Sequence, residues 1–99
     1  MTWLLAFALT CAVEFPIVAA LAPTPRIRVA IDSLAANLCT HPMAYWLVTH
    51  GWLGFWPTEA AVCVVEAAMY LGASRLPWQR AAAISLAANG VTMAMSFLW

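Results

Sequence analysis

The stretch SLAANLCTHPM at residues 33–43 returns as SLAANGVTMAM at residues 85–95, an offset of 52 positions in a chain of 99 residues. At this offset Glu14 aligns with Glu66, and 14 of 47 positions are identical when residues 1–47 are set against residues 53–99. A composition rich in Ala explains some identities, but it does not explain aligned Glu, Asn, Thr, Arg and Pro residues. The sequence therefore predicts two copies of one unit, residues 1–47 and 53–99, in a single domain over residues 1–99.

Composition predicts that the chain lies in a membrane. Hydrophobic residues make up 66% of it and charged residues 8%, whereas about a quarter of the residues of soluble domains are charged. Four apolar stretches, residues 2–22, 29–49, 57–74 and 80–98, each approach the roughly 20 residues that a membrane-spanning helix needs. We expect an all-α membrane protein of four transmembrane helices. Each half is then a helical hairpin, and the two tandem hairpins form a parallel repeat about a pseudo-two-fold axis along the membrane normal.

The basic residues predict the orientation in the membrane. All four arginines lie in two breaks between apolar stretches, PTPRIR at residues 23–28 and SRLPWQR at residues 74–80. The middle connection, HGWLGFWP at residues 50–57, has no Lys or Arg and is rich in Trp. Basic loops face the cytoplasm and aromatic residues collect at membrane surfaces. We expect a multi-pass membrane protein with both termini on the outer side, which is the periplasmic side if the chain is a protein of the bacterial inner membrane.

Two local interactions are also predicted from spacing. Arg28 and Asp32 are four residues apart and should pair on one helical face. Glu59 follows Pro57 by two residues, and in the first helical turn its charge would favour the positive end of the helix dipole. The prolines Pro25, Pro57 and Pro77 stand where a helix start tolerates them.

Polar residues inside the apolar stretches predict a buried site. Glu14 lies nine residues before the break at Pro23, and Asn37 lies nine residues after Arg28. With a rise of about 1.5 Å per residue, both reach a similar depth near the middle of the bilayer. The repeat places a second acid and amide there, with two threonines about one turn beyond, so the expected set is Glu14, Glu66, Asn37, Asn89, Thr40 and Thr92.

Two interpretations of this set stay open. Ionisable residues within a membrane face the bundle interior and commonly mark a site for protons or ligands. Burial and a neighbouring acid both disfavour the charged carboxylate, so at least one of Glu14 and Glu66 is expected to be neutral at pH 7. A neutral Glu bonded to Asn would equally make a structural clasp that fixes how the two hairpins pack, worth about 1 kcal/mol per hydrogen bond.

The two halves differ most at His41-Pro42, which the second half replaces with Met93-Ala94. His41 follows Asn37 by four residues and should face the same interior. Its imidazole is a candidate ligand for a haem or pigment metal, a proton partner for Glu14, or a hydrogen-bonding group between helices. The cofactor therefore stays unknown, and no other metal ligand is indicated. His50 falls on another face, in the outer loop.

Some classes of protein are excluded by what the chain lacks. It has no basic patch or charge run that would bind nucleic acid. Its three cysteines form no C-x-x-C pair, which argues against a zinc site and a disulfide framework. No nucleophile stands beside a base, so an intramembrane enzyme using His41 and an acid is disfavoured and we expect no enzymatic activity.

The elements ANLCTHP (residues 36–42), EAAVCVVEAAMY (59–70) and SLAAN (85–89) together resemble small uncharacterised bacterial four-helix integral membrane proteins. This resemblance covers most of the chain and implies four membrane helices but no activity. In its length and in Glu14 the chain is also similar to the small multidrug resistance transporters, which have a membrane-embedded Glu in the first helix. Glu66, the duplication and the THP element depart from that family.

Two functions follow as hypotheses. The first is a non-enzymatic accessory subunit of a larger membrane complex, with a pigment or haem near His41. The alternative is a small proton- or cation-coupled transporter or channel, in which Glu14 and Glu66 alternate between protonated and charged states. The expected partners are the lipid bilayer and either a larger membrane complex or further copies of the chain.

Overall fold

The structure is a computed structural model that describes residues 3–23 and 25–98. These residues form four α-helices and no strand: α1 (Trp3–Leu21), α2 (Arg26–Thr49), α3 (Phe55–Gly72) and α4 (Trp78–Ser96). Their bounds lie within three residues of the four apolar stretches, so the predicted all-α class with four helices is confirmed. Prolines mark the helix starts as expected, because Pro25 and Pro77 are the residues immediately before α2 and α4, where a missing N–H costs no hydrogen bond.

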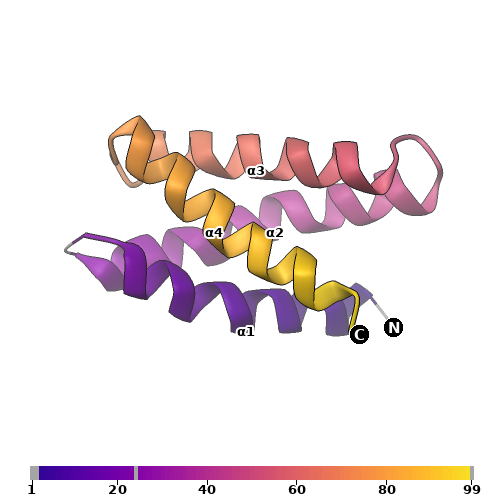
Figure 1. The fold of residues 1–99 in the computed structure, drawn as a ribbon, viewed down its shortest axis with the longest axis horizontal. Coiled ribbons are helices and arrows are strands. Elements are labelled where there is room, and N and C mark those ends of the chain that lie inside the picture. The colour runs from indigo at the N-terminus through magenta and orange to yellow at the C-terminus, as the bar shows by residue number, and fades with distance from the viewer. Residues whose placement is uncertain (1–2, 24, 99) are drawn as a thin grey trace.

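The helices form a bundle 38 Å long in which each helix packs against two others. α1 contacts α2 and α4, and α3 contacts the same two helices. Within the described residues no close backbone approach joins the diagonal pairs, α1 with α3 or α2 with α4. Figure 1 shows α1 beginning and α4 ending at one end of the bundle, together with the α2–α3 loop. The α1–α2 and α3–α4 loops lie at the opposite end.

The loop between α2 and α3 starts with a glycine-dependent turn. Gly51 has φ 70°, a left-handed conformation that Gly adopts without steric cost. Its N–H donates to the Val48 carbonyl at 3.2 Å, and the Trp52 N–H donates to the Leu47 carbonyl at 2.9 Å. This pair of bonds is the Schellman motif, which satisfies carbonyls left free at a helix end. It ends α2 at the Trp-rich segment.

The SLAAN segments supply the contacts between helices. In each copy of SLAAN the Ser, the second Ala and the Asn are buried, while the Leu is exposed. These buried positions follow the spacing i, i+3, i+4 of one helical face. Because Ser and Ala side chains are small, they let neighbouring helices approach closely. The repeated phrase therefore encodes a packing face.

The bundle is apolar outside and partly polar inside. Leu4, Leu38, Val64 and Leu86, one on each helix, are between 61% and 69% exposed. The buried polar side chains are Glu14, Ser33, Asn37, Thr40, Thr58, Glu66, Ser85, Asn89 and Thr92. Among the described residues, one helix, α1, is long and apolar enough to cross a membrane by length and composition. The other three contain more of the charged and polar residues.

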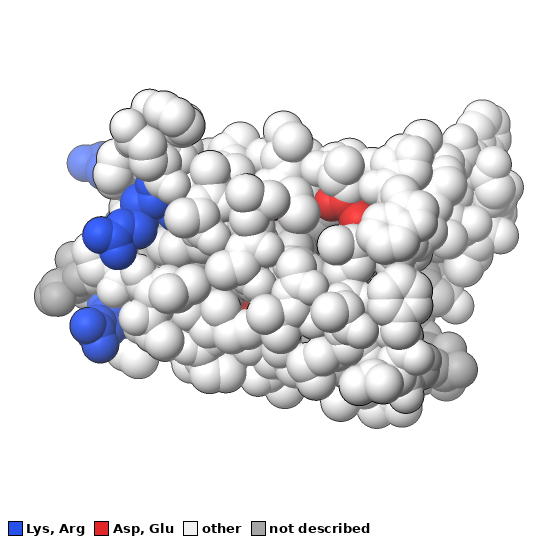
Figure 2. Space-filling model, viewed as in Figure 1, with Lys and Arg blue, Asp and Glu red and all other residues white. Residues whose placement is uncertain are grey.

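The predicted pairing of Arg28 with Asp32 is wrong. Asp32 Oδ2 instead accepts a hydrogen bond from Ser74 Oγ at 2.7 Å, and no Arg–carboxylate ion pair forms in the described residues. Asp32 is half-buried, whereas Arg28 is exposed. A bond to the adjacent hairpin therefore replaces an exposed surface pair, which would contribute little. Figure 2 shows the basic side chains gathered at one end of the bundle, away from the visible acidic atoms.

Candidate functional site

Two buried carboxyl groups sit at the centre of the bundle, and each joins three helices. Glu14 on α1 accepts from Asn37 Nδ2 at 3.2 Å and from Thr92 Oγ1 at 2.9 Å. Glu66 on α3 accepts from Asn89 Nδ2 at 2.9 Å and from Thr40 Oγ1 at 2.8 Å. The structure thus brings together all six residues that the depth argument selected. We call these contacts the Glu14 clasp and the Glu66 clasp.

The two clasps are equivalent at the offset of 52. In each, the Asn is 23 residues after the Glu and comes from the same hairpin. The Thr comes from the other hairpin, so each carboxyl group bonds across the interface between the halves. As whole residues, the two Glu are 0% and 1% exposed and the two Asn 2% and 4%. Most buried polar groups in proteins are hydrogen-bonded, and each carboxyl oxygen of the two clasps has one donor.

The threonines allow either protonation state of the acids. Thr40 Oγ1 lies 3.0 Å from the Ala36 carbonyl oxygen, and Thr92 Oγ1 lies 3.2 Å from that of Ala88. A hydroxyl group is both a donor and an acceptor. It can donate a hydrogen bond to an ionised carboxylate, or donate to the helix carbonyl and accept a hydrogen bond from the O–H of a neutral carboxyl group. Loss or gain of a proton therefore requires no rearrangement of the helices.

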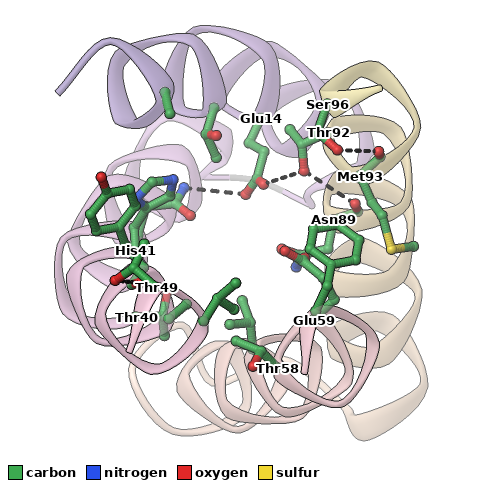
Figure 3. Close-up of a pocket in the computed structure, with 18 residues that line it drawn as sticks. Glu14, Thr40, His41, Thr49, Thr58, Glu59, Asn89, Thr92, Met93 and Ser96 are labelled. Carbon is green, nitrogen blue, oxygen red and sulfur yellow. Dashed lines mark hydrogen bonds between the residues drawn. The ribbon is translucent and has the colours of Figure 1, made fainter. Parts of the chain in front are cut away.

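A cavity of about 280 Å³ leads to the Glu14 clasp from the end of the bundle opposite the arginines. We call it the central cavity. Figure 3 shows the lining side chains of all four helices arranged around this hollow. Its deep part is lined by Glu14, Asn37 and Asn89. Its mouth is lined by residues next to the α2–α3 loop, including Thr49 and Phe55. Glu66 does not line it.

The central cavity stops at the level of the clasps. The hydrophobic core fills the half of the bundle toward the arginines, and none of its residues lines the cavity. Tyr70, the largest fully buried side chain, belongs to this core together with Val18, Ile84 and Ala88. The Glu14 clasp therefore has an open route to one end of the bundle. The hydrophobic core, which we call the plug, fills the bundle toward the other end.

Two polar residues in the cavity were not predicted as part of the site. Thr58 is 2% exposed, and its Oγ1 has no hydrogen-bond partner in the described structure. Glu59 also lines the cavity. The prediction that it lies in the first turn is wrong, because α3 begins at Phe55, two residues before Pro57. The missed signal was periodicity, since Thr58 lies eight residues before Glu66, about two helical turns on the same face.

His41 lines the central cavity but forms no hydrogen bond with Glu14. Its ring packs edge-on against Phe7, with centroids 5.4 Å apart, and lies 6.2 Å from the ring of Trp3. Its Nδ1 is buried and has no partner in the described residues. His50 lies apart, as expected, stacked on Trp46 with its Nδ1 3.0 Å from the Trp46 carbonyl oxygen.

No group of three or more His, Cys, Asp or Glu residues in the described structure could hold a metal ion. Comparison with family models, curated proteins and solved structures found no match to the chain.

Proposed function

We propose that the protein is a small proton- or cation-coupled membrane transporter or channel in which Glu14 is the coupling group. One observation carries this proposal: the central cavity joins one end of the bundle to a buried, hydrogen-bonded carboxyl group. No Lys or Arg is among the described residues that line the cavity, and these include a second carboxyl group, Glu59. An acidic, closed-ended cavity would admit a proton or cation and bring it to mid-bundle.

The proposal rests on a membrane location for all four helices. Exposed apolar side chains on every helix and a polar interior support it, because lipid solvates apolar surface and disfavours unpaired polar groups. The bundle length of 38 Å suits a bilayer whose hydrocarbon core is about 30 Å thick. The arginine end would face the cytoplasm of a bacterial cell. Both termini and the mouth of the cavity would then face the periplasm.

We also infer that the chain is a duplicated hairpin with a pseudo-two-fold axis along the membrane normal. The equivalent contacts of the two clasps support this inference. A parallel repeat of this kind places related groups at one depth on both sides of the axis. The two halves are no longer equivalent around their acids, since the cavity reaches Glu14 in the first half but not Glu66 in the second.

The clasp geometry also fits proton exchange. A coupling carboxyl group must be stable in both its charged and neutral forms, and the bifunctional Thr92 hydroxyl supplies a partner for each. Because the plug blocks the path beyond the clasps, the structure favours a carrier that changes conformation and disfavours a continuously open pore. Flux across liposomes that contain the purified protein is the direct test.

The membrane location is tested by cysteine labelling. His50 and Gln79 are both exposed and lie at opposite ends of the bundle. With the three native cysteines replaced by Ser, a membrane-impermeant maleimide added to intact spheroplasts should label the His50→Cys variant. The Gln79→Cys variant should react after lysis alone. Labelling of both variants before lysis would contradict a membrane-spanning arrangement.

An accessory subunit of a larger complex is the second candidate function, and His41 favours it. This residue lines the central cavity, and its buried Nδ1, which has no partner among the described residues, is a candidate ligand for the metal of a haem or pigment. Extraction of the native membrane in mild detergent, with particle mass and absorption spectrum recorded on one sample, separates the two functions. A large particle with a bound chromophore would support the subunit. A colourless particle of a few copies would contradict it.

A further inference from the structure

A second, smaller cavity of about 210 Å³ lies at the arginine end of the bundle. It is bounded by the first turn of α2 and the segment that follows α3. We call it the arginine cleft, and its lining residues are Pro25, Arg28, Val29, Ala73, Ser74 and Arg75. It is separate from the central cavity, with which it shares no lining residue.

Both arginines of the cleft lack a protein partner among the described residues. Neither guanidinium group forms a hydrogen bond or ion pair there. The nearby acid Asp32 does not line the cleft, and it accepts its hydrogen bond from Ser74. Arg75 also has φ 55°, a left-handed backbone conformation that is uncommon for a residue other than Gly. Positive charge is thus concentrated at a concave site, where neither arginine forms an ion pair with a described residue.

Comparison of the two halves shows how the cleft arises. Arg80, the repeat equivalent of Arg28, donates from Nη1 to the Leu21 carbonyl at the end of α1, at 3.0 Å. The residue equivalent to Leu21 is Ala73, which lines the cleft together with Arg28. The hydrogen bond between Arg80 and the Leu21 carbonyl therefore has no counterpart between Arg28 and Ala73. The equivalent position is a cleft, which Arg75 also lines.

We propose that the arginine cleft binds a phosphate group. Guanidinium groups recognise phosphate through paired charge-assisted hydrogen bonds. The α2 N-terminus has no side-chain cap, so its free N–H groups also favour an anion. The phosphate could belong to an anionic lipid headgroup or to a free phosphate compound, and the inference does not depend on transport.

Native mass spectrometry of the purified protein in detergent tests the proposal, with phosphatidylglycerol as probe and phosphatidylcholine as the zwitterionic comparison. Arg28→Gln and Arg75→Gln should each weaken phosphatidylglycerol binding by at least about tenfold, through loss of charge-assisted bonds. Arg26→Gln is the matched control, since Arg26 is exposed at the same end but does not line the cleft. It should change binding little.

The outcomes separate the sources of the phosphate. Selective binding of phosphatidylglycerol that inorganic phosphate does not displace would identify a lipid headgroup site. If millimolar inorganic phosphate displaced the bound phosphatidylglycerol, the phosphate site would be supported and its ligand would be a free phosphate compound. If all three variants weakened phosphatidylglycerol binding equally, binding would depend on surface charge alone, and the proposal would be overturned. Equal binding of the two lipids would overturn it as well.

Discussion

The Glu14→Gln variant is expected to lower proton or cation flux in liposomes to the level of protein-free vesicles. Gln has nearly the shape of Glu, and its carbonyl can still accept from Asn37, which donates to Glu14 at 3.2 Å. It has no titratable proton and no negative charge, so a cycle of protonation at the end of the cavity is lost. Because hydrogen bonds between membrane helices average about 0.6 kcal/mol, the bundle should stay folded.

The flux measurement needs a carboxyl-to-amide change elsewhere as control. Asp32→Asn meets this need, since Asp32 lies outside the central cavity and Asn can still accept from Ser74. Flux should be unchanged in this variant. Glu66→Gln should reduce flux less than Glu14→Gln, because Glu66 does not line the cavity. Wild-type flux in Glu14→Gln, with helical content intact by circular dichroism, would contradict the proposed role.

Replacement of Tyr70 by Ala is expected to have the opposite effect, an increased passive leak of protons or cations. Tyr70 is 1% exposed and is the largest fully buried side chain of the plug. Its removal would leave a void next to the clasps and join the central cavity to the arginine end. Loss of a buried aromatic ring costs roughly 3 kcal/mol, so a lower unfolding temperature should accompany the leak.

Two further variants separate a broken plug from general destabilisation. Tyr70→Phe keeps the ring and should keep the liposomes tight. Leu71→Ala removes a large side chain from the next position, but Leu71 is 49% exposed and lies outside the plug. It should not raise the leak. If Leu71→Ala leaked as much as Tyr70→Ala, or if Tyr70→Ala stayed tight while folded, the plug would not be the barrier.

Much of the central site was predictable from spacing along the chain. Glu14, Asn37 and the residues 52 positions later share one level in the bundle because helical rise converts residue number into distance, and the two acids make equivalent contacts. The helices and their proline starts follow from the same pattern. Glu59 was placed wrongly because α3 begins two residues earlier than the proline indicates, and helix boundaries are poorly specified by local sequence.

The sequence by itself determined the four helices and the level along each helix at which the acids and amides lie, because periodicity and composition act locally along one helix. The tertiary structure alone decided which threonine bonds which acid, that Asp32 bonds Ser74 instead of Arg28, and that the cavity reaches Glu14 but not Glu66. These outcomes depend on how helices from different hairpins rotate and cross. No spacing within one helix carries that information, because each contact joins residues far apart in the chain.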